Sequence, residues 1–170
     1  ARVHGPGDVR LDPVPVPEAG PGEAVVRVAA CGICGSDLGY IAQGGLGGGP
    51  LAEPLPIGHE FAGEVVAVGP GVEAGIAPGL RVAVNPDDGY IGGGGPEGAM
   101  AQYIRVTQAR IGSTLYPLAD HVGYAEAALA EPLSVALHGL RLMDVQAHHK
   151  VAVLGAGPIG LCAVAMLRHL

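Results

Sequence analysis

Four side chains of types that commonly bind zinc are spread through the chain: Cys34, His59, Glu60 and Glu131. A catalytic zinc ion needs three protein ligands and one open position for water or substrate. Each residue also has an ordinary structural explanation, because a cysteine packs well in a core and a carboxylate can be solvated or can end a helix. Residue type and spacing therefore leave two interpretations open. The four residues either form a zinc site or have separate structural roles.

A second pattern with chemical meaning is the run Gly155-Ala156-Gly157-Pro158-Ile159-Gly160. In a nucleotide-binding turn, the first glycine permits the tight turn, the second lets a pyrophosphate approach the backbone, and the third lets the helix pack closely. In a glycine-rich chain the same run can simply be a turn that enters a helix. The acidic residue expected roughly 20 positions later would fall beyond Leu170, so the sequence does not distinguish NAD from NADP.

The elements that must position these residues are mainly short strands separated by glycine and proline turns. Apolar and β-branched residues predict strands at residues 23–30, 61–69, 80–85 and 101–106. A short helix is expected after Ser36. Glycine and proline residues predict a loop at 44–56. A second loop, at 86–98, is glycine-rich and is expected to be mobile and at the surface. This pattern is typical of a small β barrel or sandwich.

After Pro117 the pattern becomes helical. Asp120 is expected to cap a helix that runs to about Ala130, and the apolar spacing of residues 133–143 predicts a second helix. Residues 151–154 predict a buried strand of a parallel sheet, followed by the glycine-rich turn and an apolar helix. The predicted domain boundary therefore lies between residues 149 and 150.

Composition disfavours several functional classes. Hydrophobic residues make up 49% of the chain and charged residues 15%, which supports a buried core. The net charge of −7, with Lys150 as the only lysine, disfavours a nucleic-acid partner. Three cysteines are too few for a disulfide framework and no secretory leader opens the chain, so a cytoplasmic location is expected. Glycine and proline interrupt the uncharged run 151–167 near its start, which disfavours a membrane span.

Four motifs follow one another along the chain: CGICGSD at 31–37, GHEFAGEV at 58–65, EPLSVALH at 131–138 and VLGAGPIGL at 153–161. Together they resemble the medium-chain zinc-dependent alcohol and polyol dehydrogenases, and within them the branch of sorbitol, butanediol, threonine and idonate dehydrogenases. The resemblance spans essentially the whole chain. It implies a mainly β GroES-like catalytic domain at residues 1–149, followed at residues 150–170 by the first βα unit of a Rossmann α/β domain.

The resemblance also implies a ligand set. Cys34 and His59 match two zinc ligands, whereas Cys31 matches a cysteine that does not bind the metal. The third ligand is a glutamate, Glu60 or Glu131, and family members exchange the two. Glu60 is the expected resting ligand, on resemblance alone. A carboxylate in place of a third thiolate leaves zinc a harder Lewis acid, which suits an alkoxide oxygen.

Further roles follow from the same resemblance. Ser36 matches the hydroxyl that takes the substrate's proton, and Asp37 matches the carboxylate that orients the ligand histidine. Tyr40 matches a tyrosine of the substrate pocket. Many relatives carry a histidine where this chain has Gly39, so proton release must use another route. Many also bind a structural zinc through four cysteines, and the corresponding segment 86–98 has none, so one catalytic zinc and no structural zinc is expected.

The expected activity is hydride transfer between a secondary alcohol or polyol and NAD or NADP, in a protein that forms homodimers or homotetramers. Two other classes stay open: a zinc-free quinone or enone reductase of the same superfamily, and a non-catalytic binding module. The chain starts at Ala1 and ends at Leu170 inside an apolar helical pattern, so both ends are expected to be trimmed. We therefore expect these 170 residues alone to aggregate, to bind zinc weakly or not at all and to bind NAD(P) below detection.

Overall fold

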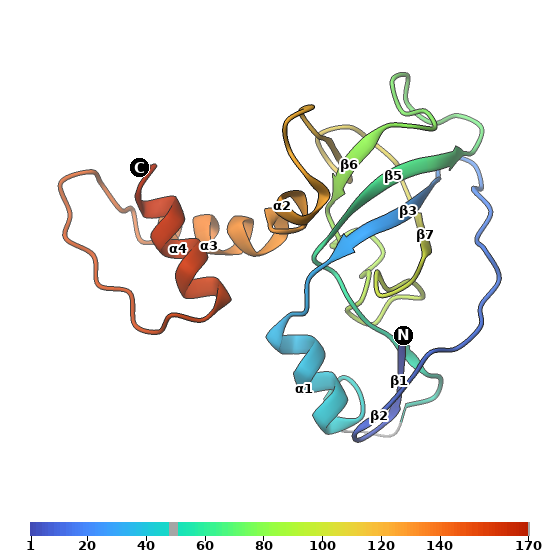
Figure 1. The fold of residues 1–170 in the computed structure, drawn as a ribbon, viewed down its shortest axis with the longest axis horizontal. Helices are drawn as coiled ribbons and strands as arrows, with labels where there is room; N and C mark the ends of the chain where they lie inside the picture. Colours follow the sequence, from blue (N-terminus) through green and yellow to red (C-terminus); the bar gives the residue numbers. More distant parts are fainter. Residues whose placement is uncertain (48–50, 170) are drawn as a thin grey trace. The chain divides into compact units, whose positions relative to one another are not determined.

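The computed structural model describes residues 1–47 and 51–169 (Figure 1). The chain divides into two compact units, Ala1–Ala128 and Leu129–Leu170. The domain boundary predicted between residues 149 and 150 lies inside the second unit and stays a prediction. The first unit contains the sheets, and the second contains two helices.

A five-stranded antiparallel sheet with strand order β7-β3-β5-β6-β8 forms the centre of the first unit. Its strands are β3 (Ala24–Cys31), β5 (Phe61–Val68), β6 (Arg81–Val84), β7 (Tyr103–Val106) and β8 (Leu115–Pro117). The two longest strands, β3 and β5, lie side by side (Figure 1). Their register sets Cys31, the last residue of β3, opposite Phe61, the first residue of β5. The segments that carry Cys34 and His59 therefore adjoin neighbouring strand ends on one side of the sheet.

A smaller sheet has the strand order β2-β1-β4, with β1 at Arg2–Gly5, β2 at Asp8–Arg10 and β4 at Leu55–Pro56. Helix α1 (Gly35–Gln43) packs against β1. The apolar side chains between them form a small second core, made of Val3, Leu55, Ile57, Tyr40 and Ile41. Because β4 ends two residues before Gly58, this sheet helps to fix the backbone that leads into His59.

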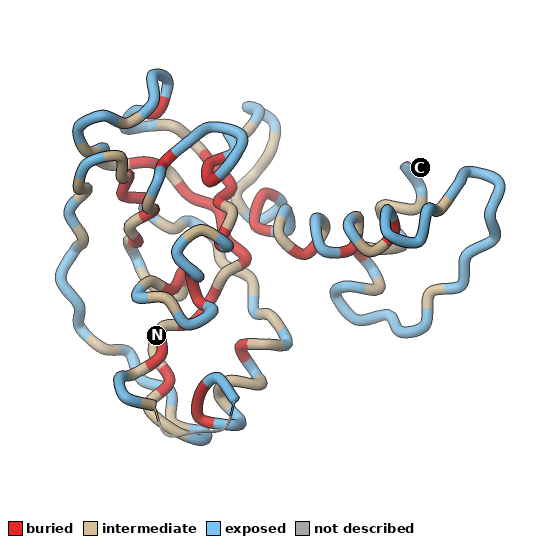
Figure 2. Tube along the Cα trace, turned by 180° about the vertical axis from the view of Figure 1, so that it is seen from behind, coloured by how far each residue is buried: buried red, intermediate tan, exposed pale blue. Residues whose placement is uncertain are grey.

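The main core lies on the large sheet, where alternate strand residues point inward. Phe61, Val65 and Ile104 expose 1% or less of their surface. The buried residues are concentrated along the strands in Figure 2. Burying each such side chain contributes about 1.5–3 kcal/mol. The core therefore stabilises the strands β3 and β5, whose adjacent ends position the segments that carry Cys34 and His59.

The glycine-rich loop 86–98 is not simply a surface loop, so that prediction is wrong for part of it. Ile91 is 3% exposed and belongs to the main core, and Gly92 is also buried. The preceding residue, Tyr90, is 73% exposed. Glycine lets this backbone pack closely, where sequence patterning predicted exposure.

Two helical predictions need correction in detail. Asp120 does not cap a helix, because residues 119–122 form a turn closed by the Val122 N–H to the Ala119 carbonyl at 3.0 Å. Helix α2 instead runs over Tyr124–Ala128. The later helix is confirmed as α3 (Ala130–Leu142), which begins earlier than predicted. Pro132 is tolerated in its first turn, where no backbone N–H is required.

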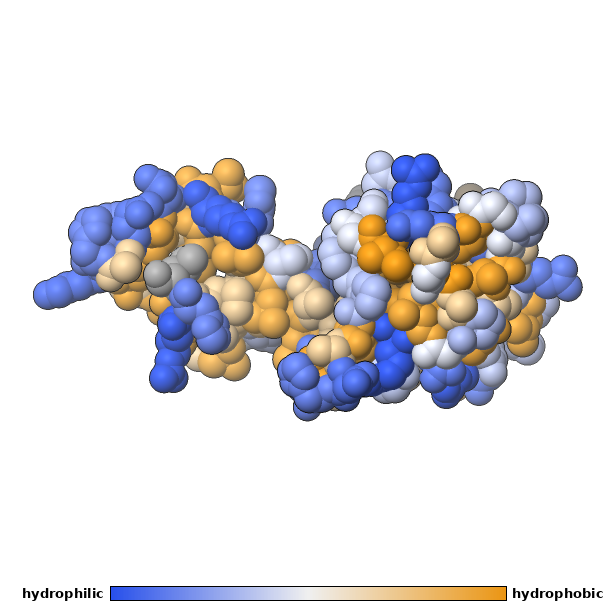
Figure 3. Space-filling view, turned by 90° about the horizontal axis from the view of Figure 1, so that it is seen from above, coloured by the Kyte–Doolittle hydropathy of each residue, from blue (hydrophilic) through white to orange (hydrophobic). Residues whose placement is uncertain are grey.

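The second unit consists of α3 packed against α4 (Pro158–Leu167), with Leu140 and Cys162 buried between them. The strand predicted at residues 151–154 does not form, because no described segment offers the hydrogen-bonding neighbours that a parallel strand needs. Leu154 is 97% exposed. Apolar surface on both units is visible in Figure 3. Neither this unit nor the rest of the described chain contains a helix with the length and hydropathy to cross a membrane.

Candidate metal centre

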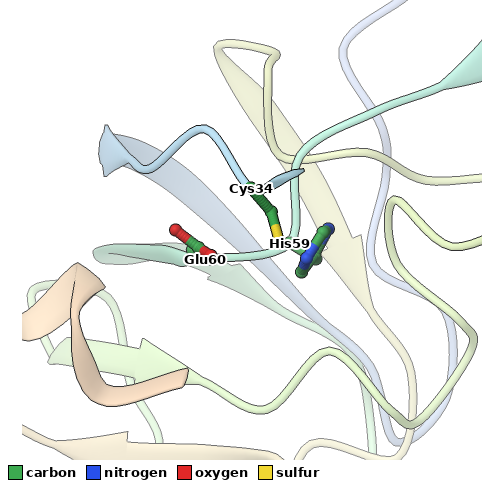
Figure 4. Close-up of side chains that lie close together, drawn as sticks. All are labelled: Cys34, His59 and Glu60. Atoms are coloured by element: carbon green, nitrogen blue, oxygen red, sulfur yellow. The ribbon is translucent and has the colours of Figure 1, made fainter. Parts of the chain in front are cut away.

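Three of the four predicted zinc ligands come together in the first unit. The donor atoms of Cys34, His59 and Glu60 all lie within 4.8 Å of one another. Cys34 lies in the segment after β3, whereas His59 and Glu60 directly precede β5 (Figure 4). In residues 1–47 and 51–169 no other group of three His, Cys, Asp or Glu donors is this close. One sulfur, one nitrogen and one oxygen form a donor set that zinc accepts.

Asp37 joins the two ligand-bearing segments. Its side chain is fully buried, and its Oδ2 accepts a hydrogen bond from the Cys34 N–H at 2.9 Å. Its Oδ1 accepts one from the Gly58 N–H at 3.0 Å. Asp37 also stands in the first turn of α1, where a negative charge is favourable next to the helix N-terminus. One carboxylate thus fixes the backbone on both sides of the site.

His59 lies between two groups of the α1 turn. Its Nδ1 is 3.7 Å from Asp37 Oδ1, which is too long for a hydrogen bond, and this buried nitrogen has no hydrogen-bond partner among the described residues. Its Nε2 is 3.5 Å from Ser36 Oγ. Asp37 therefore acts on His59 through the Gly58 backbone and through charge, rather than through a direct hydrogen bond to the ring.

Glu60 is 8% exposed, and it owes its place to a glycine that the sequence did not single out. A Cβ on Gly32 would stand 2.3 Å from Glu60 Oε2, so any larger residue would displace the carboxylate. The Gly32 N–H also donates to the Glu60 carbonyl at 2.7 Å. In the sequence, Gly32 looked like an ordinary turn residue between two cysteines.

Gly58 is the second residue that sequence reasoning missed. Its φ of +91° lies in the left-handed region that favours glycine. A Cβ there would lie 2.8 Å from the Met100 backbone nitrogen and 3.0 Å from Cys31 Sγ. The peptide that precedes His59 therefore has neither the conformation nor the space for another residue.

Cys31 lies in an environment that keeps its thiol protonated in the metal-free protein. Burial, together with the negative charges of Asp37 and Glu60, raises the pKa of the Cys31 thiol to about 12. Its Sγ donates to the Gly32 carbonyl at 3.4 Å. Because thiolates rather than thiols bind metals, this environment favours Cys34 over Cys31 as a ligand.

Tyr40 and Glu131, two other predicted site residues, have different surroundings. Tyr40 packs at the edge of the second core, so its proposed contact with substrate stays a prediction. Glu131 lies in the first turn of α3, in the second unit, where its carbonyl accepts a hydrogen bond from Ser134 Oγ at 2.7 Å. Its role as a zinc ligand also stays a prediction.

The glycine-rich turn has the local geometry expected of a helix entry. Gly155 has a φ of +102°, and a Cβ on Gly160 would meet the Gly155 carbonyl oxygen at 2.0 Å. Gly157 precedes α4 in an extended conformation, and Pro158 is the first helical residue. The first-turn N–H groups of α4 form the kind of site that binds phosphate.

Comparison with known proteins identifies the first unit. The family model of the alcohol dehydrogenase GroES-like domain matches residues 20–117 of the sequence. The chain belongs to this family. Among curated relatives, human sorbitol dehydrogenase is 39% identical over 94% of this chain and 48% of its own length. The family resemblance and the GroES-like fold inferred from the motifs are confirmed.

Solved structures agree with this assignment. The 2R,3R-butanediol dehydrogenase of Bacillus subtilis is 35% identical with a TM-score of 0.83, covering 99% of this chain and 54% of its own. The structure of a zinc-binding dehydrogenase from Sinorhizobium meliloti 1021 bound to NADP is 32% identical with a TM-score of 0.84, and the match covers 99% of this chain and 52% of that one. The chain spans about half the length of the curated relatives that it matches.

Proposed function

We propose that this chain supplies the zinc-binding catalytic half of an NAD(P)-linked dehydrogenase that acts on a secondary alcohol or polyol. The observation that carries the proposal is the cluster of Cys34, His59 and Glu60 in a GroES-like domain of the alcohol dehydrogenase family. Its human relative is named for sorbitol, and the structure from Bacillus subtilis is named for butanediol, both of which carry secondary hydroxyl groups.

The residues of the cluster fit a zinc ion. The three donors are preassembled by protein contacts, and Gly32 leaves the space that the Glu60 carboxylate fills. Three protein ligands leave one coordination position for substrate. When bound, zinc supplies Lewis-acid polarisation that lowers the pKa of an alcohol. Glu131 is the alternative glutamate ligand of this proposal.

The chain's own residues then transfer the proton of the substrate hydroxyl and hold the metal ligands in position. Ser36 Oγ, 3.5 Å from His59 Nε2, takes the proton of the substrate hydroxyl and passes it to water. A dinucleotide held at the turn of Gly155, Gly157 and Gly160 would accept the hydrogen of the carbinol carbon together with the electron pair of that carbon–hydrogen bond. Alcohol and oxidised dinucleotide thus give ketone, reduced dinucleotide and one proton. Asp37 keeps Cys34 and His59 in place throughout.

The dinucleotide site is proposed at the turn formed by Gly155, Gly157, Pro158, Ile159 and Gly160, where the pyrophosphate would meet the N-terminus of α4. Use of NAD or NADP, a cytoplasmic location and a homo-oligomeric assembly belong to the same proposal.

Metal analysis of single variants tests the proposal. We expect the full-length protein that contains this chain to hold one zinc per chain, and we expect Cys34→Ser and His59→Ala to lose it, because each removes one of three donors. Cys31→Ser is the matched control and keeps its zinc, since Cys31 is not one of the three clustered donors. Elemental analysis gives the zinc content, and circular dichroism verifies that each variant is folded.

Two results would contradict the assignment. Stoichiometric zinc in folded Cys34→Ser would place the metal elsewhere. A wild-type protein that binds no zinc, yet reduces a quinone or enone with NADPH, would identify a zinc-free reductase instead.

A further inference from the structure

We infer that residues 91–100, here called the buttress segment, hold the peptide before His59 in place, and that Gly92 is the positioning residue that makes this contact possible. The inference rests on the proposed function, because it concerns the affinity of the same metal site. The buttress segment lies partly in the glycine-rich loop that follows β6 and continues to β7. It contains no residue of the predicted ligand set.

The peptide of Gly58 is held from three sides. Its N–H donates to buried Asp37 Oδ1 at 3.0 Å, and its carbonyl accepts from the Ala99 N–H at 2.8 Å. The Met100 N–H donates to the carbonyl of the preceding residue, Ile57, at 3.0 Å. The buttress segment thus adds two backbone hydrogen bonds to the contact that Asp37 makes.

Gly92 provides the third contact by close packing. It has a φ of +65°, and a Cβ there would stand 2.2 Å from the Gly58 carbonyl oxygen and 2.5 Å from the Gly58 carbonyl carbon. These are backbone atoms, which cannot rotate away as a flexible side chain can. A side chain at residue 92 must therefore displace either the Gly58 peptide, which leads into His59, or the buttress segment that supports this peptide.

The buttress segment is itself anchored, so it can act as a support. The Gly92 N–H donates to the Glu97 carbonyl at 2.8 Å, and Ile91 is buried in the main core. Arg105 on β7 lies 3.7 Å from the Glu97 carboxylate. Because that ion pair is partly exposed and long, the backbone contacts and the buried Ile91 provide most of the anchoring.

The chain offers controls for both effects of a substitution at Gly92. Gly71 has a similar φ of +77° but open space around its Cβ position, so Gly71→Ala introduces backbone strain without a clash. Gly93 lies in the same loop, and its nearest neighbour would be 3.7 Å from a Cβ, so Gly93→Ala adds a methyl group without either effect. Gly92→Asn keeps the clash with less strain, because asparagine tolerates positive φ.

The test is a titration of the metal-free protein with Co²⁺, followed by its visible absorption, and a competition for Zn²⁺ against a chelator. We expect Gly92→Ala and Gly92→Asn to weaken metal binding by roughly 10- to 100-fold, the usual effect of losing a group that orients a ligand. Gly71→Ala and Gly93→Ala should bind like wild type. Circular dichroism at the titration temperature restricts the comparison to folded protein, and if Gly92→Ala does not fold, Gly92→Asn decides.

The inference is overturned if the folded Gly92 variants melt at a lower temperature, as Gly71→Ala does, but keep wild-type metal affinity and the wild-type Co²⁺ spectrum. A wild-type protein that binds neither metal, or a Cys34→Ser variant that binds both normally, would instead overturn the proposed function. The two failures are therefore distinguishable.

Discussion

At the scale of single residues, the site depends as much on residues that bind nothing as on the ligands. The candidate zinc ligands could be found in the sequence, because cysteine, histidine and glutamate are the residue types whose side chains bind zinc. Gly32 and Gly58 could not, because their function is to leave space for Glu60 and Met100. In a chain with 30 glycines, such a role is indistinguishable from that of a turn until the neighbouring backbone is known.

Cys31 gives a prediction about pH at this scale. Burial and the neighbouring carboxylates raise the pKa of its thiol from 9.0 to about 12. At pH 9, roughly one molecule in a thousand then carries the reactive thiolate, compared with about half for an ordinary thiol. We expect iodoacetamide to modify Cys31 of the metal-free folded protein very slowly, with the rate rising about tenfold per pH unit over the pH range in which the protein stays folded.

Peptide mapping by mass spectrometry measures this rate separately for Cys31. The same cysteine in urea-unfolded protein is the reference and should react at the ordinary rate. Equal rates for folded and unfolded protein at pH 9 would disprove the raised pKa.

At the scale of elements, sequence patterning succeeded where a strand contains two or more β-branched residues. Strands β3, β5, β6 and β7 were predicted nearly to their ends, because alternating β-branched residues on them build the core. The strands β1, β2, β4 and β8 were not predicted, because each is short and contains at most one β-branched residue. The strand expected at residues 151–154 failed for a different reason, since its apolar residues lack sheet neighbours in the structure.

The pairing of β3 with β5 provides a prediction that separates packing from charge. Phe61 is 1% exposed at the start of β5, and Phe61→Ala should lower the free energy of unfolding by about 3–5 kcal/mol. Arg27 and Glu64 also pair across these strands, but their ion pair is partly exposed, so Arg27→Ala should cost less than about 1 kcal/mol.

Urea unfolding of both variants measures the difference. Similar losses for Phe61→Ala and Arg27→Ala would mean that surface charge, rather than core packing, holds the two strands together.

At the scale of the whole molecule, the two units differ in how well they bury their apolar residues. The first unit has a continuous core, whereas Ile159, Leu161 and Val164 of α4 are each at least 45% exposed. Between α3 and α4 the chain runs through exposed residues without regular structure, and Lys150 lies there. Such segments open easily and are cut by proteases.

Because Lys150 is the only lysine, a lysine-specific protease reports on this segment alone. We expect the folded protein to be cut rapidly after Lys150, at a rate close to that of unfolded protein. Gel electrophoresis with mass spectrometry follows the products, and Lys150→Arg serves as the resistant control. Protection of Lys150 while the unfolded chain is digested would show that the segment is well ordered.

The contacts that shape the metal centre also bear on how the protein is made. Cys34, Asp37, Gly58 and the buttress segment all precede residue 101, and the sheet that supports them is complete at Pro117. Domains generally fold in order as they leave the ribosome. The first unit can therefore begin to fold, and to assemble its candidate metal ligands, before the glycine-rich turn near Gly155 has been translated.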